Sequence, residues 1–142
     1  MHDGENQHEL ILWKCPQKIR FMKIEKVNIE EKLTKVNDYW NPRVIGELNG
    51  QQVKVTKLKG EFVWHKHDSE DEMFFIIKGE LEMQLRDGSI NIKPGEFIII
   101  PKGMEHRPVA RDEVHLILFE PASTLNTGNV RNDFTKEKLE RI

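Results

Sequence analysis

The sequence predicts an all-β protein, an antiparallel sandwich or barrel formed by one domain. About eight short apolar or alternating segments follow one another between residues 43 and 119, and glycine, proline or asparagine separates them. Many short strands with frequent turn residues are typical of sandwiches and barrels. No internal repeat is present, which predicts one barrel and not two fused ones.

The chain has 142 residues and a mass of 16.8 kDa, the size of one ordinary domain. Residues 1–21 begin with a polar stretch, and we expect a flexible N-terminal extension there. Residues 22–121 are expected to form the folded domain. Residues 122–142 are expected to be a polar C-terminal tail, with a short helix near residues 134–141.

A short helix is also predicted near residues 29–36, before the first strand of the barrel. Asn28 and Glu31 have the spacing of a capping box, which marks the start of a helix. Ile29, Leu33 and Val36 follow at helical spacing, so they are expected to share one apolar face.

Turn residues separate the expected strands. Asn49-Gly50 is a strong signal for a tight hairpin, and Asp87-Gly88 and Pro94-Gly95 are further turn pairs. The expected strands are residues 43–48, 53–58, 62–67, 72–78, 81–85, 90–92, 97–100 and 114–119.

Composition excludes several classes of function. The 22 basic and 24 acidic residues give a net charge of −2, so no basic excess exists for binding nucleic acid. Cys15 is the one cysteine, which excludes an internal disulfide and a cysteine-rich zinc module. No apolar run approaches the length of a membrane span or of a signal peptide core. We therefore expect a cytoplasmic protein with no membrane partner.

His65 and His67 have the spacing of two metal ligands on one strand. Residues i and i+2 of a strand point to the same face, roughly 6.6 Å apart along the backbone. Both imidazoles can then reach one ion, whereas on a helix the same spacing would turn them to nearly opposite sides.

Glu72 and His106 can complete this site. Glu72 begins the next expected strand with the same parity as Phe74 and Ile76, so its carboxylate enters an apolar interior if that face is buried. An ionised carboxylate there needs a partner, and a metal ion supplies one. His106 follows a loop and can bring a fourth ligand from a distant part of the chain.

These residues lie in a motif. Gly60-x4-His65-x-His67-x4-Glu72-x6-Gly79 resembles the first motif of the cupin superfamily. Gly60 stands one residue closer to His65 than in the usual pattern, a change that a loop tolerates.

A second motif follows in the correct order. Gly95-x5-Pro101-x-Gly103-x2-His106 resembles the second cupin motif, and the two resemblances together cover roughly residues 43–120. Ala110 replaces the motif's closing asparagine, a position that does not usually bind metal.

The resemblance implies a double-stranded β-helix, the jelly-roll barrel of cupins, with short flanking helices. It implies one divalent metal ion held by His65, His67, Glu72 and His106. Iron, manganese, nickel, cobalt and zinc all accept such nitrogen and oxygen ligands, so the metal is not identified. Glu72 is preferred over the neighbouring acidic residues because only Glu72 fits the motif spacing; these neighbours are Asp68, Glu70 and Asp71.

The function expected from this resemblance is that of a metal-dependent enzyme, of the sugar-phosphate isomerase or dioxygenase type, with an unidentified small molecule in the barrel. The catalytic residues are unknown. A non-catalytic, metal-dependent binding module is the alternative, and a metal-free barrel is disfavoured by the ligand set. A phosphate substrate would need basic residues, and those available form no evident cluster: Lys66, Lys78, Arg86, Lys102 and Arg107.

Two further expectations concern residues outside the motifs. His115, on the last strand, is assigned a structural role. A homodimer is expected because edge strands need cover and because small cupins commonly pair. Trp40, Trp64 and Phe75 are the candidate interface residues, since each is placed outside the pocket by strand parity or loop position.

Overall fold

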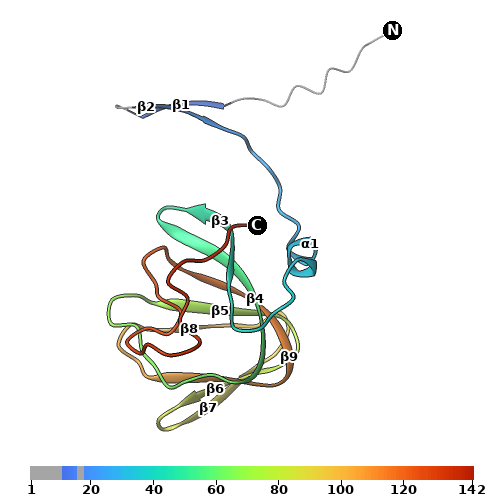
Figure 1. The fold of residues 1–142 in the computed structure, drawn as a ribbon, viewed down its shortest axis with the longest axis vertical. Coiled ribbons are helices and arrows are strands. Elements are labelled where there is room, and N and C mark those ends of the chain that lie inside the picture. Colours follow the sequence, from blue (N-terminus) through green and yellow to red (C-terminus); the bar gives the residue numbers. More distant parts are fainter. Residues whose placement is uncertain (1–10, 16–17) are drawn as a thin grey trace.

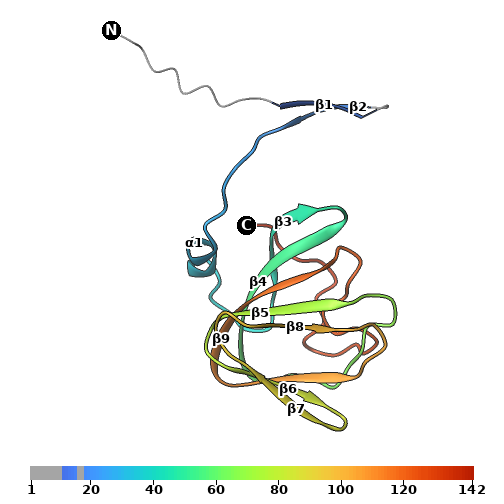
Figure 2. The same cartoon turned by 180° about the vertical axis from the view of Figure 1, so that it is seen from behind.

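The computed structural model describes residues 11–15 and 18–142. β1 (Ile11–Cys15) and β2 (Lys18–Met22) pair with each other in a two-stranded antiparallel sheet. This hairpin lies apart from the barrel in both views (Figure 1, Figure 2). The expected flexible extension falls partly on residues 1–10 and 16–17, which lie outside the described residues, and it stays a prediction.

Helix α1 (Ile29–Thr34) confirms the helix predicted after Asn28. The Asn28 side chain accepts a hydrogen bond from the backbone N–H of Glu31 at 3.0 Å, so it caps the first turn as the sequence indicated. Leu33 and Val36 are buried with Val55, so α1 covers an outer face of the barrel. No helix in residues 11–15 and 18–142 has the length and apolar character to cross a membrane.

Seven strands form the barrel, and the longest of them, β9, connects its parts (Figure 1). β9 pairs with β4 along one edge, while its other edge pairs with β6 near its start and with β5 near its end. All of these pairings are antiparallel. The strands are β3 (Arg43–Leu48), β4 (Gln51–Glu61), β5 (Glu72–Lys78), β6 (Leu81–Leu85), β7 (Gly88–Ile92), β8 (Phe97–Ile100) and β9 (His106–Pro121).

The hairpin between β3 and β4 confirms the signal of Asn49-Gly50. Both residues have positive φ, 51° and 76°, as a two-residue turn between twisted strands requires. Beyond this turn, alternate residues of β4 face opposite sides of the sheet. Val55 packs under α1 and Leu58 packs inside the barrel.

The segment of residues 62–67 is not the regular strand that the sequence predicted. β4 runs on to Glu61, and beyond it only His65 forms an isolated bridge, with His106. The segment is still extended enough to keep the alternation, because His65 and His67 are buried and Lys66 between them is partly exposed.

The helix predicted near residues 134–141 is wrong: turns and one isolated bridge, between Val44 and Arg141, occupy this region. Tertiary contacts outweigh the local helical preference there. The Phe134 ring packs against the rings of Trp40 and Phe62, with centroids 6.2 and 5.1 Å away. The C-terminal segment is therefore part of the barrel's packing.

Trp40 is a core residue and not the interface residue that the sequence predicted. Its side chain is 8% exposed and stacks on Phe62, with ring centroids 4.7 Å apart. Its φ of 57° turns the side chain inward, which a parity argument cannot anticipate. Trp64 and Phe75 are partly exposed, so the homodimer stays a prediction.

Replacing Gly79 is expected to destabilise the barrel more than replacing Gly95. Both glycines have positive φ, 82° and 84°, so alanine at either position pays about 1–2 kcal/mol of backbone strain. A Cβ at Gly79 would also lie 2.6 Å from the backbone oxygen of Glu113, whereas a Cβ at Gly95 meets nothing within 4 Å. We expect Gly79→Ala to cost about 1–3 kcal/mol more, the usual penalty of overpacking.

Urea unfolding of the two variants beside the parent protein measures this difference. Equal free energies of unfolding for Gly79→Ala and Gly95→Ala would show that the close approach of Gly79 to β9 has no energetic weight.

Candidate metal centre

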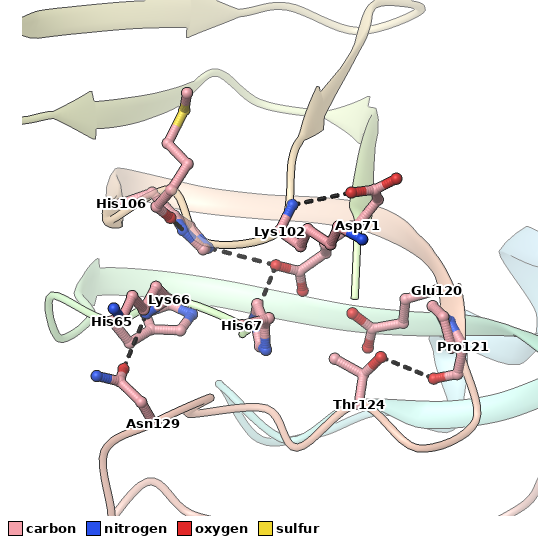
Figure 3. Close-up of polar contacts among 12 residues, drawn as sticks. His65, Lys66, His67, Asp71, Lys102, His106, Glu120, Pro121, Thr124 and Asn129 are labelled. Atoms are coloured by element: carbon pink, nitrogen blue, oxygen red, sulfur yellow. Dashed lines mark hydrogen bonds and ion pairs between the residues drawn. The ribbon is translucent and has the colours of Figure 1, made fainter. Parts of the chain in front are cut away.

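The four residues singled out in the sequence lie together at one end of the barrel. His65 and His67 follow β4, Glu72 begins β5 and His106 begins β9. One potential ligand atom from each of them lies within 4.8 Å of the others. Figure 3 shows dashed lines from His67 and His106 meeting at one carboxylate, which is that of Glu72.

Backbone hydrogen bonds bring the two distant halves of the cluster together. The N–H of His65 donates to the carbonyl of His106 at 3.1 Å, and the N–H of His106 donates to the carbonyl of His65 at 2.9 Å. The N–H of Gly103 donates to the carbonyl of His67 at 2.7 Å. The loop before β9 is thus fixed against the segment that carries the other histidines.

Asp71 has a structural role in this arrangement. Its carboxylate accepts a hydrogen bond from the N–H of Lys102 at 2.8 Å, as Figure 3 shows. Glu70 accepts one from the hydroxyl of Ser123 at 3.1 Å, and Asp68 contacts the ammonium of Lys66. None of these neighbours belongs to the cluster that includes Glu72, in agreement with the choice made from motif spacing.

Two of the imidazoles are oriented by the backbone beside them. Nδ1 of His65 lies 2.9 Å from the carbonyl of Val63, and Nδ1 of His106 lies 2.9 Å from the carbonyl of Met104. A carbonyl accepts hydrogen bonds only, so each Nδ1 carries the proton. When such a ring is neutral, its lone pair is on Nε2, which is the atom that a metal-binding imidazole then offers.

The ligand atoms are buried without adequate partners. Nε2 of His67 and Nε2 of His106 lie 3.1 and 3.3 Å from Oε2 of Glu72, yet none of the three atoms has a well-oriented hydrogen bond. The three side chains are at most 5% exposed. Buried polar atoms in this state are costly unless something else pairs with them, and a cation would pair with all three.

The electrostatics of the cluster favour the forms that bind a metal. Burial lowers the pKa of His65 to about 4, helped by the neighbouring ring of His106, so this imidazole is neutral at pH 7. Burial alone would raise the pKa of Glu72, but the rings of His106 and His67 outweigh that effect and hold it well below its usual value. Glu72 is therefore a carboxylate. Neutral imidazole and ionised carboxylate are the coordinating forms.

A buried ion pair next to the cluster was missed by the sequence analysis. Nζ of Lys54 lies 2.6 Å from Oε1 of Glu120, and both side chains are at most 2% exposed. Burial raises the pKa of the Glu120 carboxyl well above its usual value, and the nearby charge of Glu72 raises it further. The available signal was parity: Lys54 has the parity of Leu58, which faces the barrel interior.

His115 lies outside the cluster, as expected for a structural residue. Its Nε2 is 2.8 Å from a carboxylate oxygen of Glu113 on the same strand. Arg86, one of the basic residues considered for phosphate binding, stacks over the ring of Trp64 at 3.9 Å and contacts Glu105.

The comparisons with known proteins agree with this fold. A family model described as the cupin domain matches residues 52–120, which include all four clustered residues. A cupin-2 domain containing protein from Shewanella frigidimarina is 43% identical, with a TM-score of 0.66, over 67% of this chain and 93% of that chain. Protein NMB1881 from Neisseria meningitidis is 32% identical, with a TM-score of 0.64, over 69% of this chain and 100% of that chain.

A curated relative adds sequence similarity without a stated activity. The uncharacterized protein YdbB of Bacillus subtilis is 36% identical over 64 residues, which are 44% of this chain and 57% of that protein. The two solved structures are covered almost completely, and both show the same barrel. The fold is therefore the double-stranded β-helix that the motifs implied, and the chain belongs to the cupin superfamily.

Proposed function

We propose that this cupin binds one divalent metal ion through His65, His67, Glu72 and His106, and that it is a metal-dependent enzyme acting on a small molecule. The observation that carries the proposal is the convergence of three buried, inadequately paired ligand atoms on one point. A cation there converts an electrostatic cost of folding into a favourable interaction.

The donor set suits a catalytic metal. Three imidazoles and one carboxylate suit iron, manganese, nickel, cobalt or zinc, and they leave positions open when the metal is six-coordinate. A metal bound in this way polarises an oxygen of a substrate or of water. The protein's own contribution is orientation, because the carbonyls of Val63 and Met104 fix two imidazoles by their Nδ1 atoms.

A dioxygenase-type reaction is better supported than a sugar-phosphate isomerase. Isomerisation needs a side chain that moves a proton. An apolar cavity borders the four-residue cluster. Among the residues that line it, the titratable ones are His65 and Glu72, and both are proposed metal ligands. The same observation supports the second candidate, a non-catalytic metal-dependent binding module. Turnover of oxidisable small molecules by the metal-loaded protein, with oxygen consumption recorded, separates the two.

Removing two ligands is expected to abolish metal binding. After reconstitution and dialysis, the parent protein should retain one equivalent of metal and His65→Ala/His106→Ala should retain none, because two of four ligands are gone. Elemental analysis gives the stoichiometry, and circular dichroism checks that the variant is folded. His115→Ala is the matched control and should keep a full equivalent, since His115 lies outside the cluster. A full equivalent on the double variant would refute the ligand assignment.

Metal is expected to raise the melting temperature of the parent protein at pH 7.5. The ion ties His65 to His106, which are far apart in the sequence, and it binds the folded state preferentially. At free metal one hundred times the dissociation constant, the gain is about 2.7 kcal/mol, or about 5–10 °C for a domain of this size. Calorimetry with and without metal measures it. Identical melting temperatures would contradict the proposal, and His65→Ala/His106→Ala should show no rise.

The metal-free protein is expected to lose stability between pH 6.5 and pH 4. The pKa of His65 is about 4 in the folded state, against its usual value of 6.5 in the unfolded chain. In this pH range the unfolded chain therefore binds a proton on His65 that the folded protein does not bind. The free energy of unfolding decreases as the pH falls. The contribution is about 3 kcal/mol at its full extent.

Urea unfolding of the metal-free protein across this pH range tests the effect. His65→Gln has no titrating ring at this position and should flatten the profile, whereas His115→Ala should leave the slope of the parent. A parent profile with the same slope as His65→Gln would show that His65 is not the group responsible.

A further inference from the structure

An apolar cavity of about 40 Å³ lies against the proposed metal site, and His65 and Glu72 form part of its wall. Aromatic and aliphatic side chains from three strands and two loops form most of the rest, among them Phe62, Phe74 and Leu118. A ligand that binds the metal from inside the barrel has to place its remaining atoms against these side chains.

No cationic side chain in the described part of the chain lines this cavity. Among the described residues, none of those lining it is a lysine or an arginine. Lys54 is held by Glu120 at 2.6 Å, and Arg107, on the strand that carries His106, contacts Glu61 instead. A phosphate group in the cavity would be desolvated without a counter-charge other than the metal, which is strongly unfavourable.

The charge of the proposed site limits the ligand further. A divalent ion and the carboxylate of Glu72 together leave one positive charge, because imidazoles that coordinate a metal are neutral. One negative charge on the ligand balances it. A monoanion such as a carboxylate satisfies this condition, while a phosphate dianion brings an excess of charge into an apolar space.

The wall of the cavity is held in place at a conformational cost. Trp40 has a φ of 57°, unfavourable for a bulky residue by about 1–2 kcal/mol. Two hydrogen bonds hold it there: the backbone N–H donates to the carbonyl of Lys57 at 3.0 Å, and Nε1 donates to the carbonyl of Lys59 at 2.9 Å. The indole lies flat on Phe62 at an interplanar angle of 14°. Strain of this kind is typical of ligand-binding walls.

The volume limits the size of the ligand. An engineered cavity of about 150 Å³ accepts benzene, so this partly open cavity of about 40 Å³ suits an apolar body of only a few carbon atoms. Leu118, which is 6% exposed, is one of the side chains that set this limit.

We propose that the ligand or substrate of this cupin is a small monocarboxylate with a short apolar body, and that phosphorylated sugars are excluded. The carboxylate satisfies the charge of the metal and Glu72, and the apolar body occupies the cavity bounded by Phe62, Phe74 and Leu118. This inference rests on the proposed metal site and names the substrate class for it.

The test uses the full chain loaded with Mn²⁺, whose paramagnetism speeds the relaxation of protons bound near it. Isobutyrate and glucose 6-phosphate are compared as probes by ligand-observed NMR, with the parent protein loaded with diamagnetic Zn²⁺ as background and with unbound metal removed from both samples by dialysis. We expect the methyl protons of isobutyrate to relax at least fivefold faster than in this background. Glucose 6-phosphate should relax as it does in the background.

A pair of leucine variants then tests whether the cavity sets the size limit. Leu118→Ala enlarges the cavity and should shift the preference at least fivefold from isobutyrate towards the bulkier 3,3-dimethylbutyrate. Leu33→Ala removes the same atoms from the other apolar cluster, beneath α1, and should leave the preference of the parent.

The outcomes separate this inference from the proposed function. Failure of the parent protein to load Mn²⁺ or any other divalent ion would refute the metal site, and this inference with it. Loading without enhanced relaxation of isobutyrate, or with stronger enhancement for glucose 6-phosphate, would overturn the substrate class and leave the metal site intact. The same conclusion would follow if Leu118→Ala and Leu33→Ala kept the same preference.

Discussion

Two backbone hydrogen bonds between His65 and His106 hold this site together, and most of what is distinctive in the structure depends on them. They form where the chain beyond β4 meets the start of β9, next to a third hydrogen bond, from the N–H of Phe62 to the carbonyl of Pro108 at 3.0 Å. Both bonds join backbone atoms, so they do not depend on the side chains of neighbouring residues. They fix the spacing between the His65 and His106 imidazoles. His67 lies two residues after His65, and Glu72 begins the strand that follows, so both are already near the pair in the sequence.

The site has an energetic cost that the rest of the barrel offsets. Burying Glu72, His67 and His106 with poorly oriented partners is unfavourable, and the adjacent Lys54–Glu120 pair is also removed from water. A large apolar cluster within the barrel and a smaller one under α1 supply the compensating burial. The polar cluster borders the larger apolar cluster directly, because His65 packs against the ring of Phe62 and His106 against the ring of Phe74.

Much of the fold and of the cluster could be predicted because the signals were local. Turn residues such as Asn49-Gly50 and the alternation of His65 and His67 depend only on neighbours in the sequence. Residues 62–67 do not form a continuously paired strand, yet His65 and His67 are still buried on either side of the partly exposed Lys66. An extended backbone alone is enough to produce this alternation. The inward turn of Trp40 and the pairing of Lys54 with Glu120 depend on residues far apart in the sequence. No periodicity encodes them.

The C-terminal segment illustrates a further consequence of this architecture. The N–H of Lys66 donates to the side chain of Asn129, and a Cβ on Gly128 would clash with the carbonyl oxygen of Lys66. The C-terminal segment therefore packs closely against the residues that carry His65 and His67. Yet residues 122–142 lie outside the part that matches the family model, residues 52–120. A change of sequence in residues 122–142 would therefore alter the surroundings of His65 and His67 without altering any of the four clustered side chains.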